Sequence, residues 1–165
     1  MNIKNILNSG GVVRFHQQVG VTKQQNSEHQ WGVALIVQHL NPDCSKDLLL
    51  AALTHDAAES YTGDSPFPVK KDHPELSVIL RKLEVQWEKE NDINFDLSYE
   101  EKATLKLADS LEGMWYCLQR YKCGEKNALT PFNAWRKFIC GNLNMSSTYL
   151  YQSLIQEMEE LRNGS

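Results

Sequence analysis

The chain has 165 residues, of which 41% are hydrophobic and 23% are charged, and its formal net charge is −4. This length and composition are typical of one globular domain, so we expect a single domain over residues 1–165. With 17 basic against 21 acidic residues and no basic stripe, the expected partners exclude nucleic acid. No apolar run approaches the roughly 18 residues of a membrane span, and residues 1–7 are too short and polar for a secretory signal. We therefore expect no membrane partner and a cytoplasmic location.

Apolar residues recur with helical spacing along almost the whole chain, and strand-like alternation is absent. Ser27, Ser45 and Ser98 are candidate N-caps, the last of them in a capping box with Glu101. Gly63 ends a helix, and the prolines within residues 64–68 predict a rigid loop. The sequence thus predicts an all-α bundle of about six helices. They cover residues 3–8, 28–40, 46–61, 74–90, 99–121 and 130–161, the last interrupted near residues 141–142.

A cluster of histidines and acidic residues is the strongest functional signal in the chain. Glu59 follows His55 and Asp56 by about one turn, so on a helix the three side chains point toward one place. His29 lies near the start of the preceding helix, and antiparallel packing of these consecutive helices brings it close to His55. Asp109 is an acidic residue in an apolar helical stretch, where an unpaired carboxylate is costly. Two imidazoles and two carboxylates suit a divalent transition metal, and the pattern favours a metallohydrolase.

Ordinary structural roles are open for several of these residues. Asp109 has an alternative partner in Lys106, three residues earlier on the same helical face. Asp64 is either a turn residue or a polar contact to the substrate or to a second divalent ion bound with the phosphates. Arg14, Lys70 and Lys106 are candidate phosphate-binding residues, although a single cation is more often a solvated surface charge.

His29, His55-Asp56 and Asp109 match, in order and spacing, the H…HD…D motif, so the chain resembles the HD-domain metal-dependent phosphohydrolases. It is more closely similar to the bacterial HD-domain 5'-deoxynucleotidases over about residues 12–121. The segments that carry this resemblance are Arg14-Phe15, Ser27-Glu28-His29, His55-Asp56-Ala57-Ala58-Glu59, Thr62-Gly63-Asp64, Pro68-Val69-Lys70 and Lys106-x-Ala108-Asp109. In compactness the chain also resembles the phage-encoded relatives that act as dATP triphosphohydrolases.

The resemblance implies an HD-domain helical fold and a divalent metal, with Co, Mn and Zn as candidates. The implied ligands are His29, His55, Asp56 and Asp109. Glu59 and Asp56 are the implied catalytic residues, and Glu59 either activates the attacking water or protonates the leaving oxygen. Asp64 would approach the sugar, and Phe15 stands where the family usually has Trp. The implied substrate contacts are Arg14, Phe15, Asp64, Pro68, Lys70 and Lys106.

The implied reaction is cleavage of the ester between the 5' oxygen and the α-phosphorus of a small deoxynucleotide. Compactness favours dATP and related triphosphates, hydrolysed to deoxynucleoside and triphosphate, and deoxynucleoside monophosphates are the alternative. A non-catalytic, metal-stabilised module that senses nucleotides is a rival of another class. The aromatic C-terminal segment and the family's tendency to self-associate predict a homo-oligomer, and a phage-encoded protein would work in the host cytoplasm.

Overall fold

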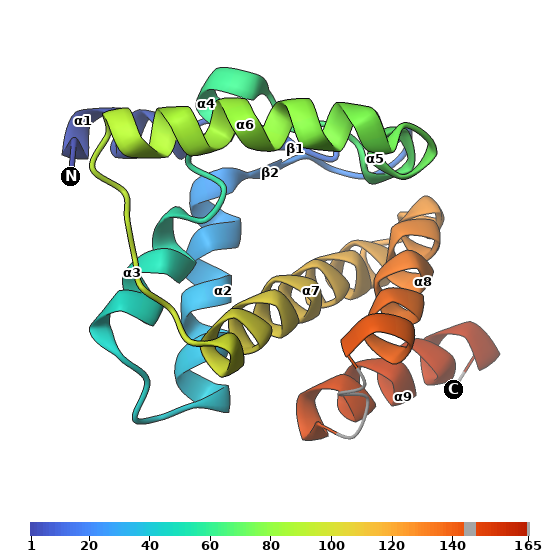
Figure 1. Ribbon diagram of the computed structural model, residues 1–165. Coiled ribbons are helices and arrows are strands. Elements are labelled where there is room, and N and C mark those ends of the chain that lie inside the picture. Colours follow the sequence, from blue (N-terminus) through green and yellow to red (C-terminus); the bar gives the residue numbers. More distant parts are fainter. Residues whose placement is uncertain (144–147, 165) are drawn as a thin grey trace.

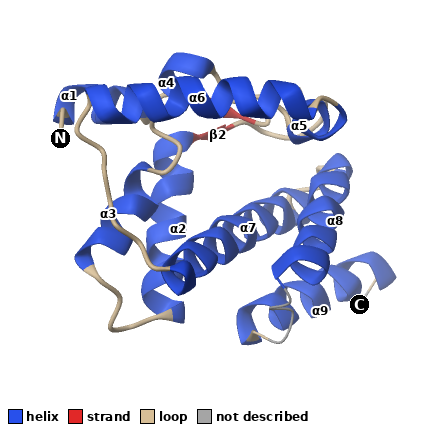
Figure 2. Ribbon diagram, in the orientation of Figure 1, coloured by secondary structure: helices blue, strands red, loops and turns tan. Residues whose placement is uncertain are grey.

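The chain folds into a bundle of helices with one short β-ribbon, shown by the computed structural model in Figures 1 and 2. The structure describes residues 1–143 and 148–164. A 3₁₀ turn at Lys126–Ala128 precedes the eighth helix and a π turn at Ile139–Leu143 follows it. The predicted all-α class is confirmed. The elements are, in chain order, α1 Ile3–Ser9, β1 Val13–Arg14, β2 Gln24–Gln25, α2 Asn26–Leu40, α3 Lys46–Thr54, α4 Glu59–Thr62, α5 Phe67–Asp72, α6 Pro74–Glu90, α7 Tyr99–Lys122, α8 Leu129–Phe138 and α9 Tyr149–Asn163.

Helix α7 is the centre of the molecule and contacts α2, α3, α8 and α9 (Figure 1). One core lies between α7, α8 and α9, where Leu118, Phe132 and Leu154 are buried. A second core lies between α2, α3 and α7 and includes Val37 and Leu48. Because each fully buried side chain of this size contributes about 1.5–3 kcal/mol, the two cores together fix α7 relative to α2 and α3. Helices α2 and α7 carry two of the four candidate metal ligands, and the other two follow the end of α3 directly.

Two of the three predicted N-caps are confirmed. Ser45 Oγ accepts from Leu48 N at 3.0 Å at the start of α3. The capping box of α7 is complete, because Ser98 Oγ accepts from Glu101 N and the Glu101 carboxylate accepts from Ser98 N. The prediction for Ser27 is wrong. The N-cap of α2 is Gln25, since β2 runs directly into the helix and the Glu28 carboxylate accepts from Gln25 N at 3.4 Å.

The helix predicted for residues 46–61 is broken, and this correction bears on the site. α3 ends at Thr54, residues 55–58 form turns, and α4 begins at Glu59. In the turns Ala57 N donates to Thr54 O and Glu59 N donates to Asp56 O, so three-residue hydrogen bonds replace the α-helical ones. The Asn26 amide also donates to the Asp56 carbonyl at 3.0 Å. This contact from a distant part of the chain satisfies a carbonyl that the helix would otherwise use.

The loop predicted for residues 64–68 ends earlier than expected, because α5 begins at Phe67 and includes Pro68. A proline in the first turn costs no hydrogen bond, since the N–H groups there have no partner within the helix. With this extra helix, the division of residues 46–61 and the separation of α8 from α9, the described residues contain nine α-helices instead of about six.

Helix α6 lies beside α4 and α5 and differs from the other long helices in its burial (Figure 1). None of its described residues is buried, and Val78 and Ile79 are more than half exposed. Among the described residues, no helix is both long enough and apolar enough to cross a membrane.

Candidate metal centre and active site

Two histidine rings from neighbouring helices face each other at the middle of the molecule. His29 on α2 and His55 directly after α3 have ring centroids 5.2 Å apart. The Nδ1 atom of His29 contacts the carboxylate of Glu112, and that of His55 lies 2.9 Å from the carbonyl of Ala52. Both Nε2 atoms are buried, and neither has a hydrogen-bond partner among the described residues. A buried nitrogen without a partner is costly, so the two Nε2 lone pairs fit ligands of a metal ion.

Two carboxylates complete the cluster that the sequence predicted. Asp109 Oδ1 is 3.3 Å from His29 Nε2, and one ligand atom each from His29, His55 and Asp109 lies within 4.8 Å of the others. Asp56 Oδ2 is 3.6 Å from His29 Nε2 and 3.3 Å from His55 Nε2. The fold therefore brings together all four residues proposed as ligands. Mixed imidazole and carboxylate donors suit Zn, Mn or Co.

Two cations balance the acidic side of this cluster. Arg14 Nη1 is 3.5 Å from Asp56 Oδ2, and Lys106 Nζ is 2.7 Å from Asp109 Oδ2. Burial by itself raises the pKa of Asp56, but the charges of His55 and Arg14 outweigh it and hold the pKa below its usual value. For Asp109 the effect of burial is likewise outweighed, chiefly by Lys106. The sequence left Asp109 either as a metal ligand or as the ion-pair partner of Lys106. Its geometry is compatible with both roles, since Lys106 binds Oδ2 while Oδ1 faces His29.

Glu59 lies at the start of α4 with a carboxylate that is mostly buried. In the part of the chain that the structure describes, its Oε2 atom has no hydrogen-bond partner. Burial and the negative charges of Asp56 and Asp64 raise the pKa of Glu59 to about 9, against the opposing effect of Arg14 and Lys70. These surroundings therefore favour the neutral, protonated form of the Glu59 side chain.

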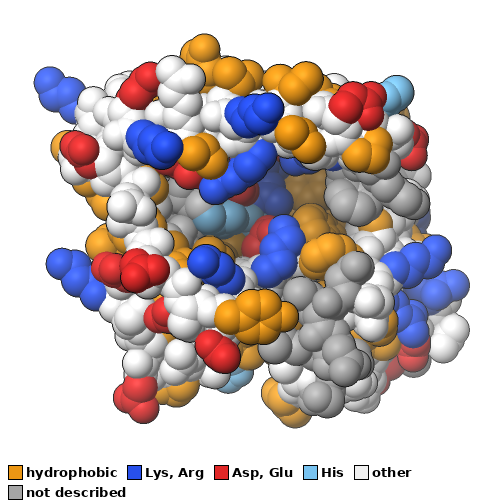
Figure 3. Space-filling model, viewed as in Figure 1, with side chains coloured by type: hydrophobic (Ala, Val, Ile, Leu, Met, Phe, Trp, Pro, Cys, Tyr) orange, Lys and Arg blue, Asp and Glu red, His pale blue; other side chains and the backbone are white. Residues whose placement is uncertain are grey.

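The remaining predicted residues lie toward the surface. On the face seen in Figure 3 the molecule is hollowed near its centre, with histidine and acidic side chains at depth and Lys and Arg side chains around them. Lys106 is 49% exposed, Lys70 is half-buried and Pro68 is exposed. Asp64 Oδ2 is 3.8 Å from His16 Nδ1, a histidine to which the sequence assigned no role. Lys70 and Lys106 are thus within reach of an anionic ligand, although Lys106 is also paired with Asp109.

Phe15 has an unusual backbone for its residue type, with a φ of 57°. This left-handed conformation costs a non-glycine residue about 1 kcal/mol or more and occurs often at functional sites. The Phe15 ring stacks on Tyr116 with centroids 5.2 Å apart and an interplanar angle of 21°. This stacking anchors Phe15 to α7. Arg14 is the residue directly before Phe15 in the chain.

Three buried polar residues beside the metal cluster were not identified from the sequence. Asn26 holds the Asp56 carbonyl, Glu112 contacts His29, and Gln24 donates to Glu112 at 2.7 Å. Burial raises the pKa of Glu112 to about 7. A local signal existed only for Glu112, which is an acidic residue one turn after Asp109 in the same apolar stretch. Nothing local distinguishes Gln24 or Asn26 from polar residues of a loop.

A helical bundle in which a His, a His-Asp pair and an Asp converge on one site belongs to the HD-domain class. Within that class the chain belongs to the family described as 5'-deoxynucleotidase YfbR-like, whose model matches residues 10–96. The match includes His29, His55, Asp56 and Glu59 and ends before Asp109. The family expected from the sequence motifs is thus confirmed.

Individual relatives agree with this assignment. A 5'-deoxynucleotidase of Yersinia pestis (strain Pestoides F) and one of Yersinia pseudotuberculosis serotype O:1b (strain IP 31758) are each 30% identical to this chain. Each match covers 63% of this chain and 65% of the relative, so the chain spans about 65% of the relatives' length. The cyanophage S-2L HD phosphohydrolase DatZ, solved with dA and one catalytic Zn²⁺ ion, has a similar fold. That similarity has a TM-score of 0.66 at 19% identity and covers 99% of this chain and 98% of DatZ.

Proposed function

We propose that this protein is a metal-dependent phosphohydrolase that cleaves the ester between the 5' oxygen and the α-phosphorus of a deoxynucleotide. The observation that carries the proposal is the convergence of two buried, unpartnered Nε2 atoms, of His29 and His55, on the Asp109 carboxylate. The buried carboxyl of Glu59 beside them favours an enzyme over a nucleotide-sensing module, because binding alone has no use for a proton donor at that place.

In this proposal His29, His55, Asp56 and Asp109 hold one divalent ion. When bound, such an ion supplies Lewis acidity to a phosphoryl oxygen and lowers the pKa of water toward neutrality. Zinc is the first candidate because the cyanophage protein of the same fold carries it, and the donor set also accepts Mn and Co.

The other site residues act on the charge and the protons of the substrate. The raised pKa of Glu59 suits this residue to give its proton to the 5' oxygen as the bond to phosphorus breaks. Arg14, Lys70 and Lys106 neutralise the phosphate oxygens, where negative charge is concentrated. Asp64 is placed to accept a hydrogen bond from the deoxyribose, and Phe15 and Pro68 would line the sugar and base pocket.

The length of the phosphate chain divides the proposal into two candidates. Deoxynucleoside triphosphates, with dATP first, are supported by the compact size that this chain shares with the cyanophage protein bound to dA. Monophosphates are supported by the name of the family and of the curated relatives. Both share the reacting bond, so the difference lies in how many phosphate groups the cations at the surface can bind.

Product analysis tests the function and separates the two substrates. Protein loaded with Zn²⁺, Mn²⁺ or Co²⁺ is incubated with each deoxynucleoside mono- and triphosphate, and phosphate is resolved from triphosphate. Deoxyadenosine plus triphosphate from dATP identifies a triphosphohydrolase, and phosphate from monophosphates alone identifies a 5'-deoxynucleotidase. Absence of every product, with the ion bound, would refute the phosphohydrolase and favour the sensing module.

The predicted homo-oligomer is also kept as a proposal. The exposed Val78 and Ile79 of α6, together with Trp31 and Leu35 of α2, are large apolar side chains more than half exposed. Burying such side chains against a second copy is favourable by about 25 cal/mol per Å² of apolar surface. Light scattering coupled to size exclusion gives the mass directly, and a monomer at micromolar concentration would contradict self-association.

A further inference from the structure

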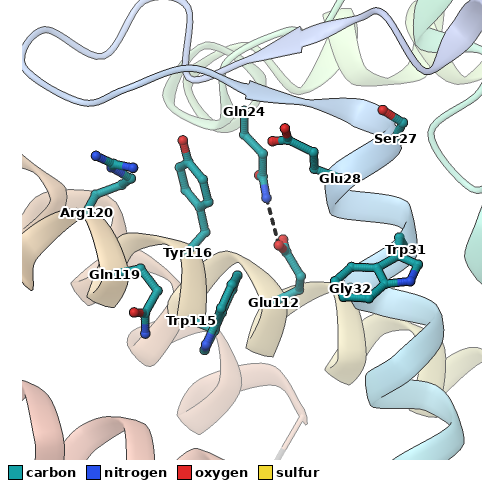
Figure 4. Close-up of a pocket in the computed structure, with 10 residues that line it drawn as sticks. All are labelled: Gln24, Ser27, Glu28, Trp31, Gly32, Glu112, Trp115, Tyr116, Gln119 and Arg120. Atoms are coloured by element: carbon teal, nitrogen blue, oxygen red, sulfur yellow. Dashed lines mark hydrogen bonds between the residues drawn. The ribbon is translucent and has the colours of Figure 1, made fainter. Parts of the chain in front are cut away.

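Glu112 is a carboxylate sealed between α2 and α7 behind the metal cluster. Its side chain is about 1% exposed, and a buried carboxylate is costly unless other groups pair with it. One of its oxygens contacts His29 Nδ1, and the other accepts from Gln24 Nε2 at 2.7 Å. Figure 4 shows the Gln24 amide, which descends from β2, pointing at the Glu112 carboxylate. Both oxygens therefore have a partner.

Gly32 makes the space that Glu112 occupies. It lies one turn after His29 on α2, and a Cβ atom added there would meet Glu112 Cγ at 2.8 Å and Oε1 at 3.3 Å. Glycine inside a helix costs about 1 kcal/mol relative to alanine, so its use here is explained by the close approach of the two helices. Helix α2 thus has a glycine at the position where it packs against the Glu112 carboxylate of α7.

We propose that Glu112 is a positioning residue for the metal centre, held by Gln24 and accommodated by Gly32. By accepting the Nδ1 proton of His29, it fixes the ring so that the Nε2 lone pair faces Asp109 Oδ1, 3.3 Å away. In its ionised form Glu112 also makes the imidazole a stronger donor to a cation. This inference rests on the proposed function only in taking His29 as a metal ligand.

The surroundings of Glu112 explain why its contact with His29 is not exchanged for water. Glu112 and Gln24 form the base of a groove of about 510 Å³ between α2 and α7, shown in Figure 4. The walls include Trp31 and Trp115, which are 61% and 45% exposed, whereas Gln24 at the base is 2% exposed. The groove therefore stops at the Gln24–Glu112 pair, and the pair separates it from His29.

Metal affinity is the direct test. The Kd for Co²⁺ is measured by chelator competition on the full chain, for wild type, Glu112→Gln and Gly32→Ala. Loss of the charge in Glu112→Gln and displacement of the carboxylate in Gly32→Ala should each weaken Co²⁺ binding by about 10–100-fold. The visible absorption of bound Co²⁺ should also change, because the His29 ring turns. Glu100→Gln and Gly141→Ala are matched controls, since Glu100 is exposed at the start of α7 and no atom of the described residues lies within 4 Å of a Cβ at Gly141.

The outcomes separate this inference from the proposed function. A Co²⁺ Kd within twofold of wild type in Glu112→Gln, with an unchanged circular dichroism spectrum of the metal-free protein, overturns the positioning role. If Gly32→Ala does not fold, Glu112→Gln decides alone, because an amide keeps the shape of the carboxylate. Failure of the wild type itself to bind stoichiometric Co²⁺ would refute the metal centre instead.

Discussion

The metal cluster and the surface that would meet the phosphates are built in opposite ways. His29 is fully buried, its Nδ1 is held by Glu112, and its Nε2 faces Asp109 at 3.3 Å. Lys106, in contrast, is 49% exposed, and Lys70 belongs to the six-residue helix α5 near the surface. The buried cluster is organised before any ligand arrives, which keeps the reacting geometry constant. The exposed cations can adjust, so we expect substrate choice to depend on them.

Removal of one buried ligand should have the largest effect. His55→Ala takes away one of the two unpartnered Nε2 atoms, and we expect loss of stoichiometric metal and a fall in kcat/KM of about 10³-fold or more. Metal content after dialysis and steady-state kinetics measure the two effects. His73→Ala, at an exposed histidine between α5 and α6, is the control. Full activity of His55→Ala would contradict the metal centre.

Removal of the proton donor should leave the buried cluster intact while abolishing most turnover. Glu59→Gln keeps the size of the side chain but cannot donate a carboxyl proton, so we expect kcat to fall by about 10²–10⁴-fold. Metal stoichiometry should stay at the wild-type value, which distinguishes this variant from His55→Ala. Glu100→Gln serves as the matched carboxylate control. Unchanged kcat in Glu59→Gln would exclude Glu59 from the chemical step.

The same variant should be more stable than wild type in the absence of metal. The pKa of Glu59 is raised from 4.5 to about 9 in the folded protein, chiefly by burial. The stability that this group contributes is therefore fully present below pH 4.5 and is lost as the pH rises toward 9. Glu59→Gln stays neutral throughout, so its free energy of unfolding should exceed that of wild type by about 2–4 kcal/mol at pH 8.5 and match it near pH 4.5. Urea unfolding in EDTA measures the difference, and a gap independent of pH would contradict the buried proton.

Removal of a cation at the surface should have the smallest effect and should reveal the substrate. Lys70→Gln is expected to raise KM by about 3–10-fold with little change in kcat, as for a solvent-exposed ionic contact of about 1 kcal/mol. Lys106→Gln should raise KM similarly and lower kcat as well, because it also removes the partner of Asp109 Oδ2. Triphosphates should be affected more than monophosphates, because they place more charge near these residues. Lys46→Gln, at the far end of α3, is the control. Equal effects on both substrates would show that these lysines contact only the α-phosphate.

Local patterns predicted most of the fold and the central residues of the site. The caps at Ser45 and Ser98 were predictable because a serine oxygen and the N–H groups of the next turn are neighbours in the chain. The convergence of His29 and His55 followed from a short connection between consecutive helices. The break after Thr54 was not predictable, because one of the contacts in this turn, from the Asn26 amide to the Asp56 carbonyl, comes from thirty residues earlier. A pattern of local apolar spacing carries no information about such a partner.

The sequence by itself determined the chemistry that we propose for this protein, since His29, His55, Asp56, Asp109 and Glu59 have donor types and spacings suited to a divalent ion and a proton transfer. Only the tertiary structure decided how those groups are held. Glu112 contacts a histidine 83 positions away and an amide 88 positions away. Gly32 leaves the space that the Glu112 side chain needs to make these two contacts. The physical reason is that a side chain's donors and acceptors are set by its type. Which of them end up buried, and against what, is set by the packing of helices far apart in the chain.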